Sequence, residues 1–133
     1  MDETLKKIEQ FHGHLGPFAV IGYKMGKISN QKINNDPFKK KVTVFTGNKP
    51  PMSCIADGIQ LSSGCTLGKG NIIISDQKKP FAKFSDNNGK ILEISLKEDI
   101  LEEINSNVTE ENIEEYSKKI YRKTDEELFL IKS

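Results

Sequence analysis

The stretch FAKFSDNNGKILEISL, residues 81–96, places an Asn-Gly pair between two strand-like runs. This arrangement is typical of a β-hairpin, because asparagine and glycine readily adopt the positive φ angles of tight turns. Two further segments, residues 41–46 and 71–75, are short and rich in β-branched side chains, as strands are. We therefore expect a mainly antiparallel sheet in the middle of the chain.

Helical periodicity dominates on both sides of these strands. The expected helices are residues 3–12, 17–29 and 53–63, followed from residue 97 by a series that includes 109–121 and a short helix from Asp125. We expect Ser53 and Thr109 to cap their helices through the side-chain hydroxyls. The order helices, strands, helices predicts an α+β fold with helices packed on the sheet. No repeat or linker divides the chain, so we expect one domain over residues 1–133, of which 97–133 is an acidic helical extension.

The net charge of +1 is unevenly distributed along the chain. Residues 1–96 carry 14 basic and 8 acidic side chains, whereas residues 97–133 carry 6 and 11. Opposite net charges attract, so we expect the acidic segment to pack on the basic remainder, within one chain or across a dimer. The basic clusters, residues 39–41 and 78–79, are short and separate, so a nucleic-acid partner is not expected.

Neither a membrane span nor a secretory signal is expected. No apolar run approaches the roughly 20 residues that cross a bilayer, and the first residues are acidic, where a secretory signal would be basic and then apolar. We therefore expect a cytoplasmic protein, in which Cys54 and Cys65 are thiols or metal ligands rather than a disulfide.

The small residues Ala19, Gly22 and Gly26 lie on one face of the expected helix 17–29. A glycine in a helix interior costs up to about 1 kcal/mol relative to alanine, so close approach by another element is the expected compensation. The hydrophobic content is modest, at 35%. We therefore expect a homodimer whose interface exceeds the roughly 1,600 Å² of a standard complex.

His12 and His14 are the only histidines, and they flank Gly13 in the segment FHGHLGP, residues 11–17. Residues two apart on a rigid helix point to different faces, but a glycine between them lets the backbone turn both imidazoles toward one point. Neutral imidazole is the commonest protein ligand for zinc and similar ions. Both histidines are therefore candidate metal ligands, with helix capping or core packing as the alternative.

Cys54 and Cys65 are candidate thiolate ligands at the two ends of the expected helix 53–63. Eleven residues along a helix span about 16 Å, so both thiols reach one ion only if the chain folds back at Gly64. Cys54 is preferred, because a helix N-terminus lowers the pKa of a thiol, and Cys65 is a further candidate. Two imidazoles and one thiolate would leave a tetrahedral ion one free position.

Asp57 and Lys69 are the remaining candidates for chemistry. Asp57 lies one helical turn after Cys54 and is a candidate metal ligand, acceptor for an imidazole or general base, with a solvent-exposed helix acid as the alternative. Lys69 lies in the segment GCTLGKGN, residues 64–71, which has three residues between its first glycines where a Walker loop has four. Lys69 is therefore a candidate anion contact, with ordinary turn chemistry as the alternative.

The segments FHGHLGP, residues 11–17, and CIADGIQLSSGCTLGKGN, residues 54–71, resemble the FmdE family of formylmethanofuran dehydrogenase, over about residues 8–96. The resemblance implies an α+β core, a tightly associated homodimer and a bound divalent metal ion, with zinc as the expected cofactor. It also implies a link to methanogenesis and archaeal one-carbon metabolism. The partner there would be the large molybdenum or tungsten dehydrogenase complex that makes formylmethanofuran from carbon dioxide.

Two features of that family are missing from this chain. Many relatives carry a cysteine two residues after the second histidine, where this chain has Gly16, and others carry a C-terminal zinc finger, whereas no cysteine follows Cys65. We therefore expect a metal-binding accessory protein. The alternative is a metal-dependent enzyme for a small C1 or pterin-like substrate, with Asp57 as base and Lys69 as anion contact.

Overall fold

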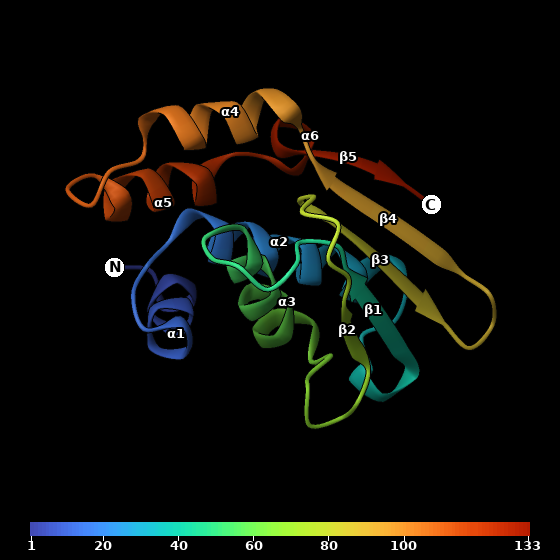
Figure 1. Cartoon of the computed structure of the whole chain (residues 1–133). Coiled ribbons are helices and arrows are strands. Elements are labelled where there is room, and N and C mark those ends of the chain that lie inside the picture. The colour runs from blue at the N-terminus through green and yellow to red at the C-terminus, as the bar shows by residue number, and fades with distance from the viewer.

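A five-stranded sheet with the order β2-β1-β3-β4-β5 forms one layer of the computed structural model, which describes residues 1–133 (Figure 1). The strands are β1 (Lys40–Val44), β2 (Ile72–Ile74), β3 (Phe81–Asp86), β4 (Ile91–Leu96) and β5 (Phe129–Lys132). β1 and β2 are parallel, and all other neighbours are antiparallel. The expected α+β fold with a mainly antiparallel sheet is confirmed.

The hairpin between β3 and β4 forms at the Asn-Gly pair, as expected. The Asp86 carboxylate accepts hydrogen bonds from the backbone amides of Asn88 and Lys90, both at 2.9 Å. Gly89 has a φ of 84°, which a residue with a side chain rarely adopts. The turn thus sets the register in which Phe84 lies opposite Leu92, with both side chains fully buried.

The helices pack on one face of the sheet and across its end (Figure 1). They are α1 (Glu3–His12), α2 (Pro17–Lys32), α3 (Ile55–Ser63), α4 (Glu98–Asn107), α5 (Ile113–Arg122) and α6 (Asp125–Leu128), with short 3₁₀ turns η1 (Pro37–Lys39) and η2 (Met52–Cys54). α2 and α3 pack side by side, α1 contacts both, and the α4–α5 hairpin reaches the molecule through contacts of α5 with α2. None of the helices is both long enough and apolar enough to cross a membrane.

The core lies between the helices and one face of the sheet. Alternate residues of β1, β3 and β4 point inward and are at most 2% exposed: Val42, Val44, Ala82, Phe84, Leu92 and Ile94. The helices contribute Ile8, Ile21, Met25, Ile55, Ile59 and Ile120, each at most 1% exposed. The alternation in the strands is therefore the sequence signal of a sheet with one buried face.

Three local expectations are wrong. Residues 129–132 form β5, antiparallel to β4, where no strand was expected. The helix expected from residue 53 begins with a 3₁₀ turn, and Ser53 makes no capping hydrogen bond. The N-cap of α5 is Asn112 rather than Thr109, whose hydroxyl accepts from the Asn112 amide at 3.2 Å. Each difference concerns a short terminal segment whose conformation depends on its tertiary neighbours.

The small-residue face of α2 packs against α3 of the same chain. A Cβ atom on Gly22 would lie 1.9 Å from the Ile55 carbonyl oxygen, and one on Gly58 would lie 2.0 Å from the Ala19 carbonyl oxygen. Gly26 approaches the Ser62 hydroxyl equally closely. The close approach expected for this face is thus present, but it is used within the chain. It therefore gives no argument for a dimer interface, and the homodimer stays a prediction.

Gly22→Ala should lower the free energy of unfolding by about 2 kcal/mol or more, because the added methyl group meets backbone atoms of α3 that cannot move independently. Gly68→Ala is the matched control, since a Cβ atom there meets nothing within 4 Å and should change the stability by less than about 0.5 kcal/mol. Urea unfolding of the two variants measures the difference. Equal stability would contradict the close contact between α2 and α3.

Candidate functional site

The C-terminal end of α1 and the following turn bring the two imidazoles together. Gly13, with a φ of 103°, ends the helix in the left-handed region, and its amide donates to the Glu9 carbonyl at 2.8 Å. The chain then reverses before Pro17 begins α2. As a result the ring centroids of His12 and His14 lie 5.0 Å apart, with 33° between the ring planes.

Asp57 orients the imidazole of His12. The His12 Nδ1 atom lies 2.6 Å from a carboxylate oxygen of Asp57, in the first turn of α3. A carboxylate can only accept, so Nδ1 carries the proton and the lone pair of a neutral ring is on Nε2. The acceptor role of Asp57 is therefore the one that the structure shows, among those expected for it. This pairing of a carboxylate with the far nitrogen is common for histidines that bind a metal through the other nitrogen.

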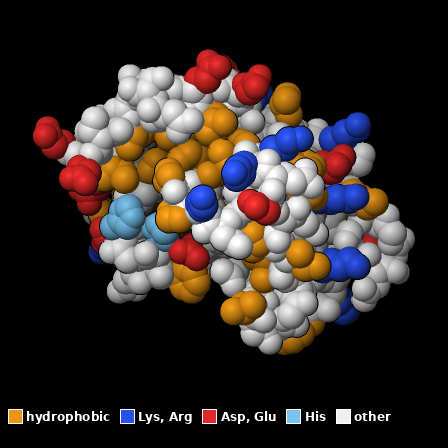
Figure 2. Space-filling model, viewed as in Figure 1, with side chains coloured by type: hydrophobic (Ala, Val, Ile, Leu, Met, Phe, Trp, Pro, Cys, Tyr) orange, Lys and Arg blue, Asp and Glu red, His pale blue; other side chains and the backbone are white.

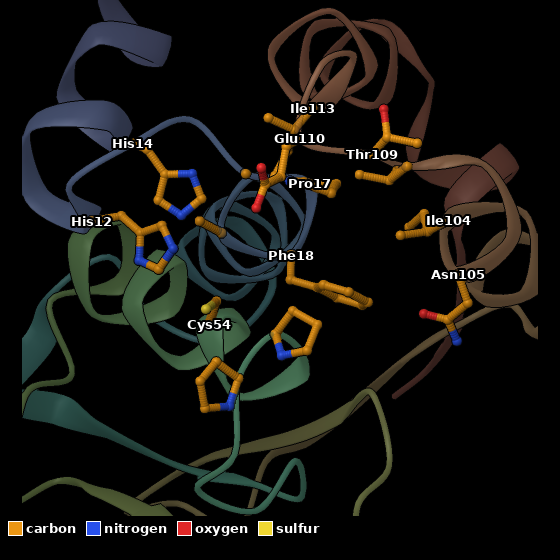
Figure 3. A pocket seen from close by; sticks show the side chains of 15 residues that line it. His12, His14, Pro17, Phe18, Cys54, Ile104, Asn105, Thr109, Glu110 and Ile113 are labelled. Carbon is orange, nitrogen blue, oxygen red and sulfur yellow. The ribbon is translucent and has the colours of Figure 1, made fainter.

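The two histidines line a cavity of about 380 Å³ (Figure 3). Three separate segments form its walls: the turn from His12 to Ala19, the segment from Pro50 to Cys54, and the end of α4 with the loop into α5. In the close-up the histidines lie above Cys54 on one side, and Ile104, Asn105 and Thr109 lie on the other. From the outside, the cavity is visible as an apolar hollow below the α4–α5 hairpin, with the histidines at its edge (Figure 2).

Cys54 lines this cavity, but its thiol differs from the expected one. Burial raises the pKa of Cys54 above its ordinary value, and the nearby Asp57 carboxylate raises it further. The expectation that the helix N-terminus lowers this pKa is wrong, because desolvation of the thiolate and a neighbouring negative charge outweigh the helix dipole. In the free protein Cys54 is therefore a protonated thiol at neutral pH, and a metal ion would have to displace its proton.

Cys65 and Lys69 lie apart from the cavity. Cys65 is completely buried in the core, with its sulfur 3.9 Å from the Lys40 carbonyl oxygen, and burial raises its pKa. The Lys69 ammonium lies over the ring of Phe38, 5.5 Å from its centroid, and 3.4 Å from the Thr66 hydroxyl. Neither residue lines the cavity with the histidines. Both cysteines are free thiols.

The donors in the cavity provide part of a metal-binding shell. His12 and His14 are neighbours, but no three His, Cys, Asp or Glu side chains are grouped closely enough to hold an ion. Gly16 faces both rings: a Cβ atom there would lie 3.5 Å from His14 Cε1 and 4.0 Å from His12 Nε2. The position at which many relatives have cysteine is therefore adjacent to both imidazoles, and in this chain it supplies no ligand.

The sequence did not indicate the wall formed by the C-terminal segment. Ile104, Asn105, Val108, Glu110 and Ile113 line the cavity opposite the histidines. The helical periodicity of this segment shows which face is apolar, but not which part of the molecule that face meets. No motif in the segment identifies Glu110 as a cavity residue.

The fold and this cavity define a small α+β protein in which a carboxylate-oriented histidine and a second imidazole border an apolar pocket. Comparison with known proteins shows its family. The family described as "FmdE, Molybdenum formylmethanofuran dehydrogenase operon" matches residues 11–130, which includes the C-terminal wall of the cavity. The chain belongs to the FmdE family.

Two relatives illustrate how far the similarity extends. A protein of Archaeoglobus fulgidus, named as a probable S-adenosyl-L-methionine-binding protein, is 30% identical over 81 residues, which are 59% of this chain and 22% of the relative. The chain thus spans about a fifth of that relative's length. A crystal structure of an FmdE-like protein of tungsten formylmethanofuran dehydrogenase, from Syntrophus aciditrophicus, matches with a TM-score of 0.65 and 19% identity, over 98% of this chain and 69% of the other. The second match shows that the two proteins share a fold.

Asp57→Asn should reduce the fraction of His12 that carries its proton on Nδ1, because the neutral amide is a weaker acceptor than the carboxylate. It should also lower the stability by about 1 kcal/mol, at the low end for a charged hydrogen bond because the Asp57 side chain is 40% exposed. Two-bond ¹⁵N–¹H correlation spectra at pH 8 report the tautomer. Asp99→Asn, in the first turn of α4, is the matched control and should leave the His12 signals unchanged. The same tautomer in both variants would show that Asp57 does not orient the ring.

Proposed function

We propose that this chain is a metal-binding accessory protein of the FmdE type, associated with formylmethanofuran dehydrogenase. The observation that carries the proposal is the His12–Asp57 pair, which directs a free imidazole nitrogen toward the side on which His14 lies. His12 Nε2 and His14 would hold a divalent ion, with zinc as the expected metal, and Cys54 would be the third donor. Membership of the FmdE family supports a role in one-carbon metabolism.

The site would be open rather than closed. Two imidazoles and one thiol leave at least one position of a tetrahedral shell for water or another ligand. Gly16 adds no donor, and the Asp57 carboxylate already accepts from His12. A small movement of Cys54 or His14 would be needed to close the shell, since the three donors are not grouped around one point. We therefore expect weaker and more exchangeable binding than at a structural zinc site.

A second function, a metal-dependent enzyme for a small C1 or pterin-like substrate, is favoured by the cavity itself. Its volume of about 380 Å³ is within the range of small-molecule sites, and it adjoins both imidazoles. A bound ion would act there as a Lewis acid. Asp57 would hold the ring of His12 in the correct tautomer, and the side chains of the apolar walls would exclude water from the substrate. Lys69 has no part in this alternative, because it lies outside the cavity.

His14→Ala should remove about one equivalent of metal per chain from protein purified without chelators or a histidine tag, as measured by elemental analysis. Cys54→Ala should weaken zinc binding, whereas Cys65→Ala, a change of the other thiol, should not, because only Cys54 lines the cavity. Titration with a zinc indicator compares the two cysteine variants. Full metal content in His14→Ala, or equal effects of the two cysteine variants, would contradict the proposed ligands.

Gly16→Cys should strengthen zinc binding by about tenfold or more, since it places a thiol next to both imidazoles. The backbone at residue 16 is extended, with φ −131° and ψ 148°, and accepts any side chain. Gly16→Ser is the matched control: it has nearly the same shape but a much poorer ligand atom for zinc. If both variants bind zinc like the wild type, the metal does not lie between the imidazoles and residue 16.

A further inference from the structure

Glu110 is the only acidic residue among the 15 that line the cavity, and none of the 15 is lysine or arginine. The positive charge that His12 could carry already faces the carboxylate of Asp57. The Glu110 carboxylate is thus the one formal charge of the cavity wall without a partner of opposite sign. In the close-up it points into the hollow near His14 and Pro17 (Figure 3).

We propose that this cavity binds a small organic cation, with an apolar body and a protonated or quaternary nitrogen, and that Glu110 is its counter-ion. The proposal goes beyond the metal site and does not require a metal. An anion such as a phosphate ester would meet Glu110 without any basic partner, and desolvating such a pair is unfavourable. Charge complementarity therefore selects the sign of the ligand.

The acidic surroundings extend the same preference to the mouth of the cavity. Acidic side chains gather at the end of the α4–α5 hairpin, beside the hollow (Figure 2). Glu111, Glu114 and Glu115 follow Glu110 in this part of the chain. Lysine and arginine side chains in this view lie on the other side of the hollow, over the sheet. A negative potential at the hairpin end attracts a cation before it enters.

The remaining walls suit the apolar body of such a ligand. Phe18 points into the hollow, and Ile104, Val108 and Ile113 line the wall beside Glu110. An aromatic face also attracts a cation within about 6 Å of its centroid. The volume of about 380 Å³ is near the lower end for ligand pockets, which limits the ligand to a small molecule.

The loop that carries Glu110 is held in place by Asn112. Its side chain accepts from the Thr109 amide at 2.7 Å and donates to the Asn107 carbonyl at 2.8 Å. Its backbone amide donates to the Thr109 hydroxyl at 3.2 Å. These bonds span the loop on both sides of Glu110, so the carboxylate is positioned before a ligand arrives.

The test compares three probes of similar size: phenyltrimethylammonium, its neutral isostere tert-butylbenzene, and the anion benzenesulfonate. Methyl NMR spectra of chelator-treated protein, with labelled isoleucine, report binding through Ile104 and Ile113. We expect phenyltrimethylammonium to shift both signals and to bind at least about fivefold more tightly than tert-butylbenzene. Benzenesulfonate should bind most weakly. No shift with the cation, or equal or tighter binding of either other probe, would overturn the proposal.

Glu110→Gln should weaken binding of phenyltrimethylammonium by about fivefold and leave tert-butylbenzene unaffected. Glu111→Gln is the matched control, since its side chain is exposed and does not line the cavity. Equal effects of both variants would reject Glu110 as the counter-ion. Because the protein is free of metal here, this result is independent of the metal content of His14→Ala, and the two proposals can fail separately.

Discussion

The close contact between α2 and α3 is the constraint on which the site depends. Gly22 lies against the carbonyl of Ile55, the first residue of α3, and Gly58 lies against α2 one turn later. Asp57 directly precedes Gly58, and Cys54 directly precedes Ile55. The absence of side chains at two glycines therefore fixes the position of the two α3 residues that meet the histidine turn. Without that approach the Asp57 carboxylate would not reach His12 at 2.6 Å.

Much of the fold and part of the site could be predicted from local sequence patterns. The Asn-Gly hairpin, the helix that starts at Pro17 and the turn that joins His12 to His14 each depend on residues near one another in the chain. β5 could not be predicted, because residues 129–132 form a strand only by pairing with β4. The positions of Cys65 and Lys69 depend on the packing of the loop after α3, for which the spacing of residues gives no information.

The raised pKa of Cys54 shows the same limit in electrostatics. A rule based on helix position predicts a lowered pKa, since the N-terminal end of a helix stabilises negative charge. Burial and the Asp57 carboxylate act in the opposite direction, and both arise from tertiary structure. The same carboxylate thus makes His12 a better donor to a metal while it makes the Cys54 thiol harder to ionise. Such a site favours the imidazoles as the first ligands of an ion.

The cavity is a preformed part of the fold, because its C-terminal wall is anchored independently of any ligand. α5 packs on α2 through the buried Ile120, and the Lys24 ammonium donates to the carbonyl of Lys123 at 2.8 Å. α4 and α5 are joined by the Glu103–Lys119 pair at 3.7 Å and by the bonds of Asn112. A wall held in this way loses little conformational entropy when a ligand binds, so even a small molecule with few contacts can bind measurably. The acidic segment therefore has a physical role that its charge alone does not reveal: it places one carboxylate opposite the imidazoles of the N-terminal turn.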